Sequence, residues 1–189
     1  ALKGKKMPPF YTRRGDDGTT GLLGEGRVKK FDPRMEALGA IDEASAALGL
    51  SRSLLTLPPL IEITKKVQRD LYKIMAEIAA ESKHSEKFRS VDGSHVSWLE
   101  EQTDAISTQI TLPKEFILPG DTNAAGALSL ARTIVRRAER RVVELRDAEL
   151  IRNDHLLAYL DRLSWLRFVM EDYEVQFNEG RGPTLAKGQ

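Results

Sequence analysis

The sequence contains no cysteine among its 189 residues. A disulfide scaffold, a thiolate metal site and a catalytic cysteine nucleophile are therefore excluded. Long hydrophobic runs are missing as well, because no apolar stretch approaches the roughly 20 residues of a membrane-spanning helix. We therefore expect a cytoplasmic protein without a membrane partner.

Excess charge of one sign is also missing. The chain carries 29 basic and 28 acidic side chains, for a formal net charge of +1. Domains that bind nucleic acid usually show a basic excess, so we expect no nucleic-acid partner, and any anion site must be local. Hydrophobic residues make up 41% and charged residues 30% of a length that suits one domain with a real core.

Glycine is concentrated in one segment near the start, residues 10–33, which is also rich in Asp, Thr and Lys. The glycines exclude a helix there and let the backbone approach a ligand closely. Asp32-Pro33 then marks a helix start, with aspartate as the cap and proline at the first position. Within a single domain, we assign 1–33 to an N-terminal segment, 34–178 to a helical bundle and 179–189 to a loose tail.

Apolar residues at spacings of three and four predict five helices beyond Pro33. The predicted helices cover about 34–55, a stretch after Pro58-Pro59 that includes 67–78, a stretch from 92 through 106, about 123–148 and about 154–177. Residues 83–91 are polar and predict a loop, and two prolines and a glycine make 111–121 a non-helical connector. We therefore expect an all-α five-helix bundle with an irregular glycine-rich N-terminal segment. The long apolar faces also favour oligomerisation.

The densest cluster of chemistry-bearing side chains lies in the fourth predicted helix. At about 100° per residue, Arg132, Arg136, Glu139 and Arg140 share one face beside the buried seam, whereas Arg137 points to the far side. Guanidinium groups bind phosphate oxygens in a bidentate manner, and a carboxylate can hold an arginine or a Mg²⁺ shell, so this face suits a polyphosphate. Two alternatives stay open: a solvated face with weak ion pairs, and an RNA-binding face, which the lack of interleaved aromatics disfavours.

Two further features allow more than one interpretation. Glycines, hydroxyls and arginines between Tyr11 and Gly21 can surround a phosphate with backbone N–H groups, or they can form a flexible leader. The segment lacks the Gly-Lys-Ser/Thr of a Walker A loop. Asp42 lies beside seam residues of the first helix, where it either reaches water or pairs with Arg132.

The remaining candidates point to structural roles. His84, His95 and His155 lack the spacing of metal ligands on a helix, which favours surface or helix-capping positions. Trp98 and Trp165 fit core or subunit packing better than a cofactor cage.

A series of short motifs follows one another over nearly the whole chain: Tyr11-Thr12 through Gly15-Asp16 and Gly18, Gly24, Asp32-Pro33, Asp42-Glu43, Phe116-Ile117-Leu118-Pro119-Gly120, Ala127-Leu128, Ala131-Arg132-Thr133, Arg136-Arg137-Ala138-Glu139-Arg140 and Arg162-Leu163-Ser164. In this order they resemble the ATP:cob(I)alamin adenosyltransferases of the trimeric helical-bundle type. Each motif alone is weak, but the ordered set is specific. The resemblance implies a homotrimer with active sites between subunits, and ATP, Mg²⁺ and cobalamin as ligands.

The resemblance also implies roles for individual residues. ATP would lie under the N-terminal segment of one subunit, which wraps the nucleotide, and against the arginine helix of its neighbour. Asp42 and Arg132 match a salt bridge between subunits, and Arg136 matches a triphosphate position; these three are the implied catalytic residues. Glu139 matches a Mg²⁺ position, and Phe116 matches an aromatic that crowds the lower face of cobalamin. The implied ATP-binding positions also include Thr12, Arg13, Arg14, Gly15, Asp16, Gly18, Thr19, Thr20, Lys29, Arg137, Arg140 and Asp161.

The implied reaction needs no protein nucleophile. Reduced cobalt attacks the 5′ carbon of ATP and triphosphate leaves, so the protein has to position ATP and stabilise the leaving group. Three positions depart from the family pattern: Asp161 where Asn is common, Trp165 where Asp usually follows the serine, and Asp121 where a small residue follows Pro119-Gly120. If phosphates lie near Asp161, then Mg²⁺, Arg136 or Arg140 must offset its charge.

Two rival functions stay open. One is an ATP-binding paralogue that acts as a sensor or carrier without transferase activity. The other is a structural helical oligomer that binds no ligand. For the transferase, a reductase or a cobalamin-dependent enzyme would be a further protein partner.

Overall fold

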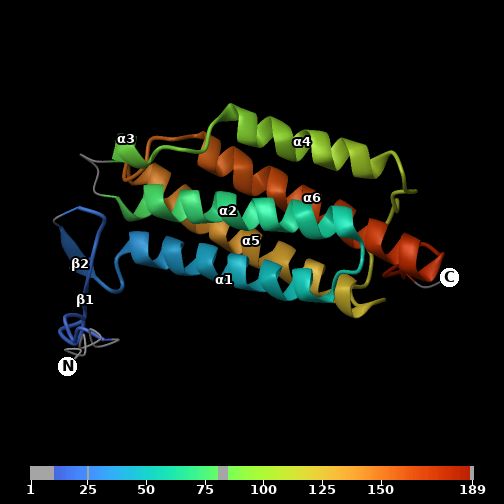
Figure 1. Ribbon diagram of the computed structural model, residues 1–189, viewed down its shortest axis with the longest axis horizontal. Helices are drawn as coiled ribbons and strands as arrows, with labels where there is room; N and C mark the ends of the chain where they lie inside the picture. The colour runs from blue at the N-terminus through green and yellow to red at the C-terminus, as the bar shows by residue number, and fades with distance from the viewer. Residues whose placement is uncertain (1–10, 25, 81–84, 188–189) are drawn as a thin grey trace, which may run out of the picture.

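Five long helices lie side by side in an elongated bundle (Figure 1). A computed structural model describes residues 11–24, 26–80 and 85–187, so the start of the predicted N-terminal segment, His84 and the last two residues of the tail lie outside the described residues. The elements are β1 (Thr19–Gly21), β2 (Arg27–Lys29), α1 (Pro33–Leu54), α2 (Pro58–Ala79), α3 (Ser85–Phe88), α4 (Gly93–Ser107), α5 (Asn123–Asp147) and α6 (His155–Glu179). The prediction of an all-α bundle is confirmed. Within those described ranges, no helix combines the length and the apolar character needed to cross a membrane.

The two predicted caps, Asp32 and Asp92, are confirmed. Asp32 accepts a hydrogen bond from the Arg34 N–H at 2.9 Å, and Pro33 occupies the first turn of α1. Asp92 caps α4 by accepting from the Ser94 N–H at 3.0 Å, and the His95 side chain completes a capping box. The capping role expected for a histidine is therefore found at His95.

The core follows the seam predicted for α5. This helix packs against α1 on one side and against α6 on the other, while α2 covers α1 and α4 covers α6. The α5 seam is fully buried at Leu128, Ala131, Val135, Ala138, Val142 and Leu145. On α1 the seam is shifted from the prediction, because Leu38 and Ser45 are only half-buried. Small residues take their place, and the buried positions of α1 include Ala37, Ile41, Ala44 and Leu48.

The glycine-rich segment is not wholly irregular, as the sequence led us to expect. β1 and β2 pair as an antiparallel hairpin in which Thr20 lies opposite Val28. Strands of three residues are too short to show an alternating pattern in the sequence. The Leu23 N–H donates to the Ala79 carbonyl at 2.8 Å and so attaches the hairpin to the end of α2. The polar stretch predicted as a loop also contains one short helix, α3.

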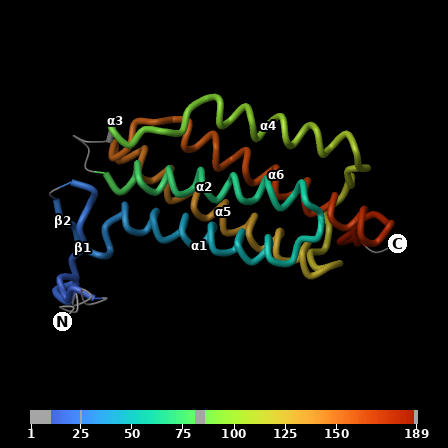
Figure 2. The backbone as a smooth tube through the Cα atoms, in the orientation of Figure 1, coloured from blue at the N-terminus to red at the C-terminus, as the bar shows by residue number. Residues whose placement is uncertain are grey.

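The tail, predicted to be loose, folds back onto the connector 111–121. α6 ends at Gly180, whose φ of 67° reverses the chain direction. The Leu118 N–H then donates to the Thr184 carbonyl at 2.8 Å, and the Ala186 N–H donates to the Phe116 carbonyl at 2.7 Å. Figure 2 shows the tail at one end of the bundle and the N-terminal hairpin at the other.

Arg34 joins three separate parts of the chain. Its Nη1 donates to the carbonyls of Ile78 at 2.9 Å and Ala80 at 3.2 Å, and its Nη2 donates to the Leu150 carbonyl at 2.8 Å. The side chain is buried, so these carbonyls have little access to water. Burial lowers the pKa of Arg34, but the guanidinium stays charged near neutral pH.

We predict that Arg34→Met lowers the free energy of unfolding by about 2–4 kcal/mol, because two buried carbonyls and one partly buried carbonyl lose a charged donor. Arg146→Met removes an exposed arginine paired with Asp147 at 3.3 Å, and it should change stability by less than about 1 kcal/mol. Both variants are compared with the parent by denaturant unfolding at one protein concentration. Equal, small effects of the two substitutions would contradict the role assigned to Arg34.

Candidate functional site

A pocket of about 410 Å³ opens between the connector, α5 and α6. The connector supplies Pro113, Lys114, Glu115, Phe116, Ile117 and Pro119. The two helices supply Ser129, Arg132, Arg136, Ser164, Trp165 and Phe168. The pocket therefore combines aromatic and apolar surface with two guanidinium groups. Such a lining suits a ligand with a large apolar ring and a nearby anion.

Two aromatic side chains of the pocket face water. Phe116 is 89% exposed and Trp165 is 57% exposed. Large apolar groups that protrude beside a pocket are typical of a contact surface. Trp165 is therefore not part of the core of the chain, whereas Trp98 is partly buried against the core. Phe116, which the resemblance assigned to the lower face of cobalamin, lines this pocket.

The predicted arginine face is found on α5. Arg132 and Arg136 are one turn apart and both line the pocket. Arg137 points the other way and forms an ion pair with Glu43 of α1, in a groove that Arg141 also lines. One chain therefore brings Arg132 and Arg136 together and keeps Arg137 apart from them, although the resemblance placed all three near the ligands.

Glu139 and Asp161 interact across the contact between α5 and α6. Burial raises the pKa of Glu139, and the negative charge of Asp161 raises it further, while Arg136 and Arg140 lower it. Asp161 itself pairs with Arg162, which also binds Glu100 at 2.9 Å. In the free chain Asp161 is thus paired with Arg162 of its own helix. The expectation that Mg²⁺, Arg136 or Arg140 offsets its charge concerns a site that holds phosphates, and it stays a prediction.

A buried polar layer lies beneath the pocket. Ser129 and Glu171 are almost fully buried, and the Nε of Arg132 is buried without a hydrogen-bond partner among the described residues. Burial raises the pKa of Glu171 to about 7, although the hydrogen bond from Ser129 and the positive charge of Arg132 both lower it. The site therefore holds a carboxyl group that titrates near neutral pH, next to an arginine with an unused donor.

The N-terminal half of the implied site is folded but lies elsewhere. Figure 1 shows the hairpin at the end of the bundle where α1 begins, away from the connector. Thr19 Oγ1 donates to Asp17 at 2.8 Å and accepts from Arg27 Nε at 3.0 Å, while Gly18 has a φ of 76° that favours glycine. The implied ATP-binding residues of this segment are Thr12, Arg13, Arg14, Gly15, Asp16, Gly18, Thr19, Thr20 and Lys29. One chain does not place them at the arginine pocket.

Asp42 was expected either to reach water or to pair with Arg132. In the free chain it is exposed on α1, so its carboxylate reaches water. Arg132 instead faces the pocket between α5 and α6. A direct pair between the two residues would need a second chain.

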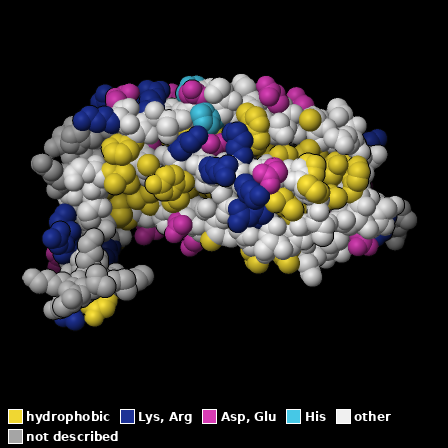
Figure 3. Space-filling model, in the orientation of Figure 1, with side chains coloured by type: hydrophobic (Ala, Val, Ile, Leu, Met, Phe, Trp, Pro, Cys, Tyr) yellow, Lys and Arg dark blue, Asp and Glu magenta, His cyan; other side chains and the backbone are white. Residues whose placement is uncertain are grey.

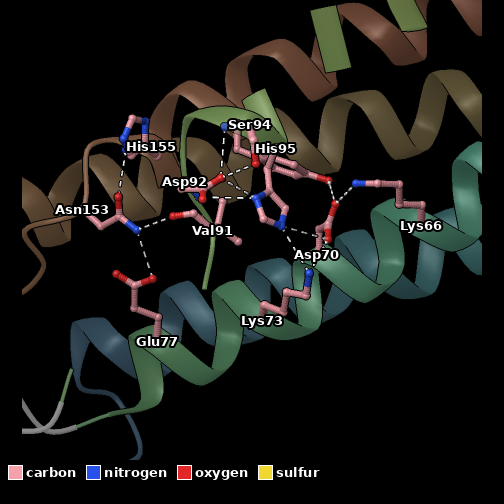
Figure 4. A network of polar contacts seen from close by, with 11 residues as sticks. Lys66, Asp70, Lys73, Glu77, Val91, Asp92, Ser94, His95, Asn153 and His155 are labelled. Atoms are coloured by element: carbon pink, nitrogen blue, oxygen red, sulfur yellow. Dashed lines mark hydrogen bonds and ion pairs between the residues drawn. The ribbon is translucent and has the colours of Figure 1, made fainter. Parts of the chain in front are cut away.

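A second polar cluster, formed by α2, α4 and α6, is satisfied internally (Figure 4). Asp70 is 2% exposed and accepts from Lys66 Nζ at 2.8 Å and from Lys73 Nζ at 3.1 Å. Burial would raise the pKa of Asp70, but these lysines outweigh it and lower the pKa. Tyr159 OH also donates to Asp70, at 3.2 Å. The cluster around Asp70 has the features of a structural network rather than of a ligand site. On the surface, basic side chains gather in the middle of this face of the molecule (Figure 3).

No group of three or more His, Asp or Glu side chains within residues 11–24, 26–80 and 85–187 is arranged to hold a metal ion alone. Glu139 and Asp161 are the acidic side chains that interact beside the arginines.

Sequence reasoning missed several residues of the site. Ser129 lies one turn before Arg132 and so shares its face, which was a usable signal. Ser164 was part of a matched motif but received no role. The sequence did not indicate that Glu171 is buried at the site, because an acidic residue on an amphipathic helix is expected to face water.

Three comparisons with known proteins found similar chains. The cobalamin adenosyltransferase family matches residues 10–174. The corrinoid adenosyltransferase of Bacillus subtilis is 40% identical over 159 residues, which are 82% of this chain and 80% of that protein. The corrinoid adenosyltransferase PduO of Citrobacter freundii is 37% identical over 173 residues, 89% of this chain. The chain spans about half the length of that relative, 51%.

A solved structure has the same fold. It is a variant PduO-type ATP:corrinoid adenosyltransferase from Lactobacillus reuteri complexed with cobalamin and ATP, at 32% identity. Its TM-score to this chain is 0.87, and the match covers 95% of this chain and 97% of that one.

We predict that Glu171 makes stability depend on pH. Between its ordinary pKa of 4.5 and its folded pKa of about 7, the folded protein holds a proton that the unfolded chain has released. Stability from this group is therefore lost as the pH rises through that window, by roughly 3 kcal/mol at most. Glu171→Gln does not titrate, so its unfolding free energy relative to the parent should rise over this range and level off above pH 7. If the difference in unfolding free energy between Glu171→Gln and the parent stays constant from pH 4.5 to 8, the raised pKa of Glu171 is contradicted.

Proposed function

The chain belongs to the cobalamin adenosyltransferase family, and on that premise we propose that it transfers the 5′-deoxyadenosyl group of ATP to the cobalt of reduced cobalamin. The observation that carries the proposal is the pocket in which exposed Phe116 and Trp165 stand beside Arg132 and Arg136. An apolar aromatic surface suits the corrin ring, and the guanidinium groups suit the triphosphate.

The residues present fit a reaction in which the substrates supply the nucleophile and the leaving group. The cobalt–carbon bond forms as the bond from the 5′ carbon to the triphosphate oxygen breaks. In this proposal Arg136 and Arg132, which line the pocket, stabilise the negative charge on the departing triphosphate. Phe116 restricts the space on the lower face of the corrin, and Trp165 borders the same pocket.

We also propose that Mg²⁺ enters with ATP at Glu139. Carboxylate oxygens are ligands that Mg²⁺ accepts, usually together with phosphate oxygens. Asp161 is a second carboxylate in the immediate electrostatic environment of Glu139. A cation between them would offset the negative charge of Asp161, which adds to burial in raising the pKa of Glu139. The departure at position 161 therefore supports a metal-assisted site.

A complete site requires more than one chain in this proposal. The nucleotide-wrapping residues of segment 1–33 lie at the end of the bundle away from the connector, and Asp42 is exposed on α1 (Figure 1). A homotrimer would bring the hairpin and Asp42 of one subunit to Arg132 and Arg136 of its neighbour. A reductase that delivers the electron, or an enzyme that uses the product, would then be the further partner.

The alternative is an ATP-binding paralogue without transferase activity. The three departures from the family pattern are the observation that favours it: Trp165 lines the pocket, Asp161 acts on Glu139, and Asp121 binds Arg181 of the tail. A structural oligomer without a ligand is disfavoured by the Nε of Arg132, which is buried without a hydrogen-bond partner among the described residues.

The deciding experiment supplies ATP, Mg²⁺ and chemically reduced cobalamin and follows the spectrum of the cobalt–carbon product. We expect adenosylcobalamin and triphosphate in equal amounts, and a trimer by light scattering at micromolar protein. ATP binding without product would identify the silent paralogue, and a monomer would contradict the shared site.

We predict that Arg136→Ala weakens ATP binding by about 1.5–3 kcal/mol, because one charge-assisted pair to phosphate is lost. This corresponds to roughly a 10- to 150-fold higher Kd by calorimetry. Arg141→Ala, on the same helix but in the groove against α1, is the matched control and should bind ATP like the parent. Unchanged affinity in Arg136→Ala would remove this residue from the site.

A further inference from the structure

We propose that Asp121 is a positioning residue that holds the tail 181–186 against the connector and thereby sets the place of Phe116 in the corrinoid pocket. The effect on the corrinoid rests on the proposed function. The contact itself does not, and it can be tested without any substrate.

Both oxygens of the Asp121 carboxylate are engaged by the tail. Thr184 Oγ1 donates to Oδ1 at 2.6 Å, the Thr184 N–H donates to Oδ2 at 2.8 Å, and Arg181 Nη2 donates to Oδ1 at 3.0 Å. The Asp121 side chain is only 9% exposed. Hydrogen bonds from Thr184, followed by Arg181, hold the pKa of Asp121 below its usual range. Hydrogen bonds to an ionised acceptor are among the stronger ones in proteins.

Thr184 transmits this contact to the connector. Its N–H binds Asp121, while its carbonyl accepts from the Leu118 N–H at 2.8 Å. Two residues further on, the Ala186 N–H donates to the Phe116 carbonyl at 2.7 Å, and Leu185 bridges to Ile117. The residue that bears the pocket aromatic is thus bonded through its own backbone to the segment that Asp121 holds.

The ends of the connector are attached separately. Gln176 of α6 accepts from the Thr111 N–H at 3.1 Å and donates to the Thr111 carbonyl at 3.0 Å. Thr122 Oγ1 donates to Glu174 of α6 at 2.5 Å. The middle of the connector, between these anchors, contains Pro113 and Pro119, which cannot donate. Its backbone is therefore ordered by the tail rather than by a helix.

The position of Phe116 has to come from its backbone. The ring is 89% exposed, so burial against neighbouring side chains does not hold it. A pocket wall that is ordered before the ligand arrives avoids the entropic cost of ordering it on binding. Asp121 stands where the family pattern has a small residue, so this chain adds a charged attachment point at that position.

The test compares the parent with Asp121→Asn, which keeps the shape but removes the charge and one acceptor oxygen. Hydrogen exchange of the ligand-free protein should become at least roughly tenfold faster at the Leu118 and Ala186 amides. Thr184→Val, which removes only the hydroxyl donor, should produce a smaller change at the same amides. Glu179→Gln removes an exposed carboxylate at the end of α6 and serves as the matched control, with parental exchange.

Kinetics then separate positioning from a general loss of stability. In Asp121→Asn we expect the KM for reduced cobalamin to rise roughly tenfold while the KM for ATP stays within about twofold, because only the corrinoid wall is loosened. Asp121→Glu, which keeps the charge, should recover part of the loss. Unchanged exchange at both amides would overturn the attachment, and faster exchange with an unchanged KM for cobalamin would overturn the positioning role. An inactive parent would contradict the proposed function, while the exchange result would still decide the attachment.

Discussion

The close packing of α5 between α1 and α6 decides where the arginines of the pocket stand. The seam of α5 is narrow and fully buried at Ala131, Val135 and Ala138, so its two flanks face different neighbours. Consecutive residues are turned by about 100°, which sends Arg136 to the pocket and Arg137 to Glu43 of α1. A rotation of α5 by one residue would turn Arg136 away from the pocket and toward α1. The chemistry of the pocket therefore depends on the apolar packing of the opposite side of the helix.

Periodicity predicted the long helices and the α5 seam because both are local properties of the chain. The caps at Asp32 and Asp92 were predictable for the same reason. The hairpin and the pairing of the tail were not, because their strands are too short to show a period and Ile117 meets Leu185 far along the sequence. In the sequence Asp121 appeared only as a departure from a family pattern. Its partners Arg181 and Thr184 could not be predicted, because they reach Asp121 only after the chain reverses direction at Gly180.

The polar layer beneath the pocket links the attachment of the tail to the arginines. Burial is the main cause that raises the pKa of Glu171, and the negative charges of Asp172 and then of Asp121 add to it. Arg132 opposes that rise with its positive charge. A buried acid near an unpaired donor costs stability, and such costs concentrate at functional sites. The bundle thus gives up some stability at the end where the proposed chemistry takes place.

On one chain the two halves of the implied site lie at opposite ends of the bundle, and this separation is the basis of the proposed assembly. α1 has 22 residues and so rises about 33 Å, and the hairpin lies beyond its first residue. The connector with Phe116 lies at the other end of the bundle (Figure 2). A rigid helix of this length cannot bend to bring the glycine-rich backbone of its own chain to the pocket. A neighbouring subunit, placed side by side, can supply that backbone together with an exposed Asp42. In the proposed trimer, the active site therefore has to lie at the interface between two subunits, because the helices are too long for one chain to form it.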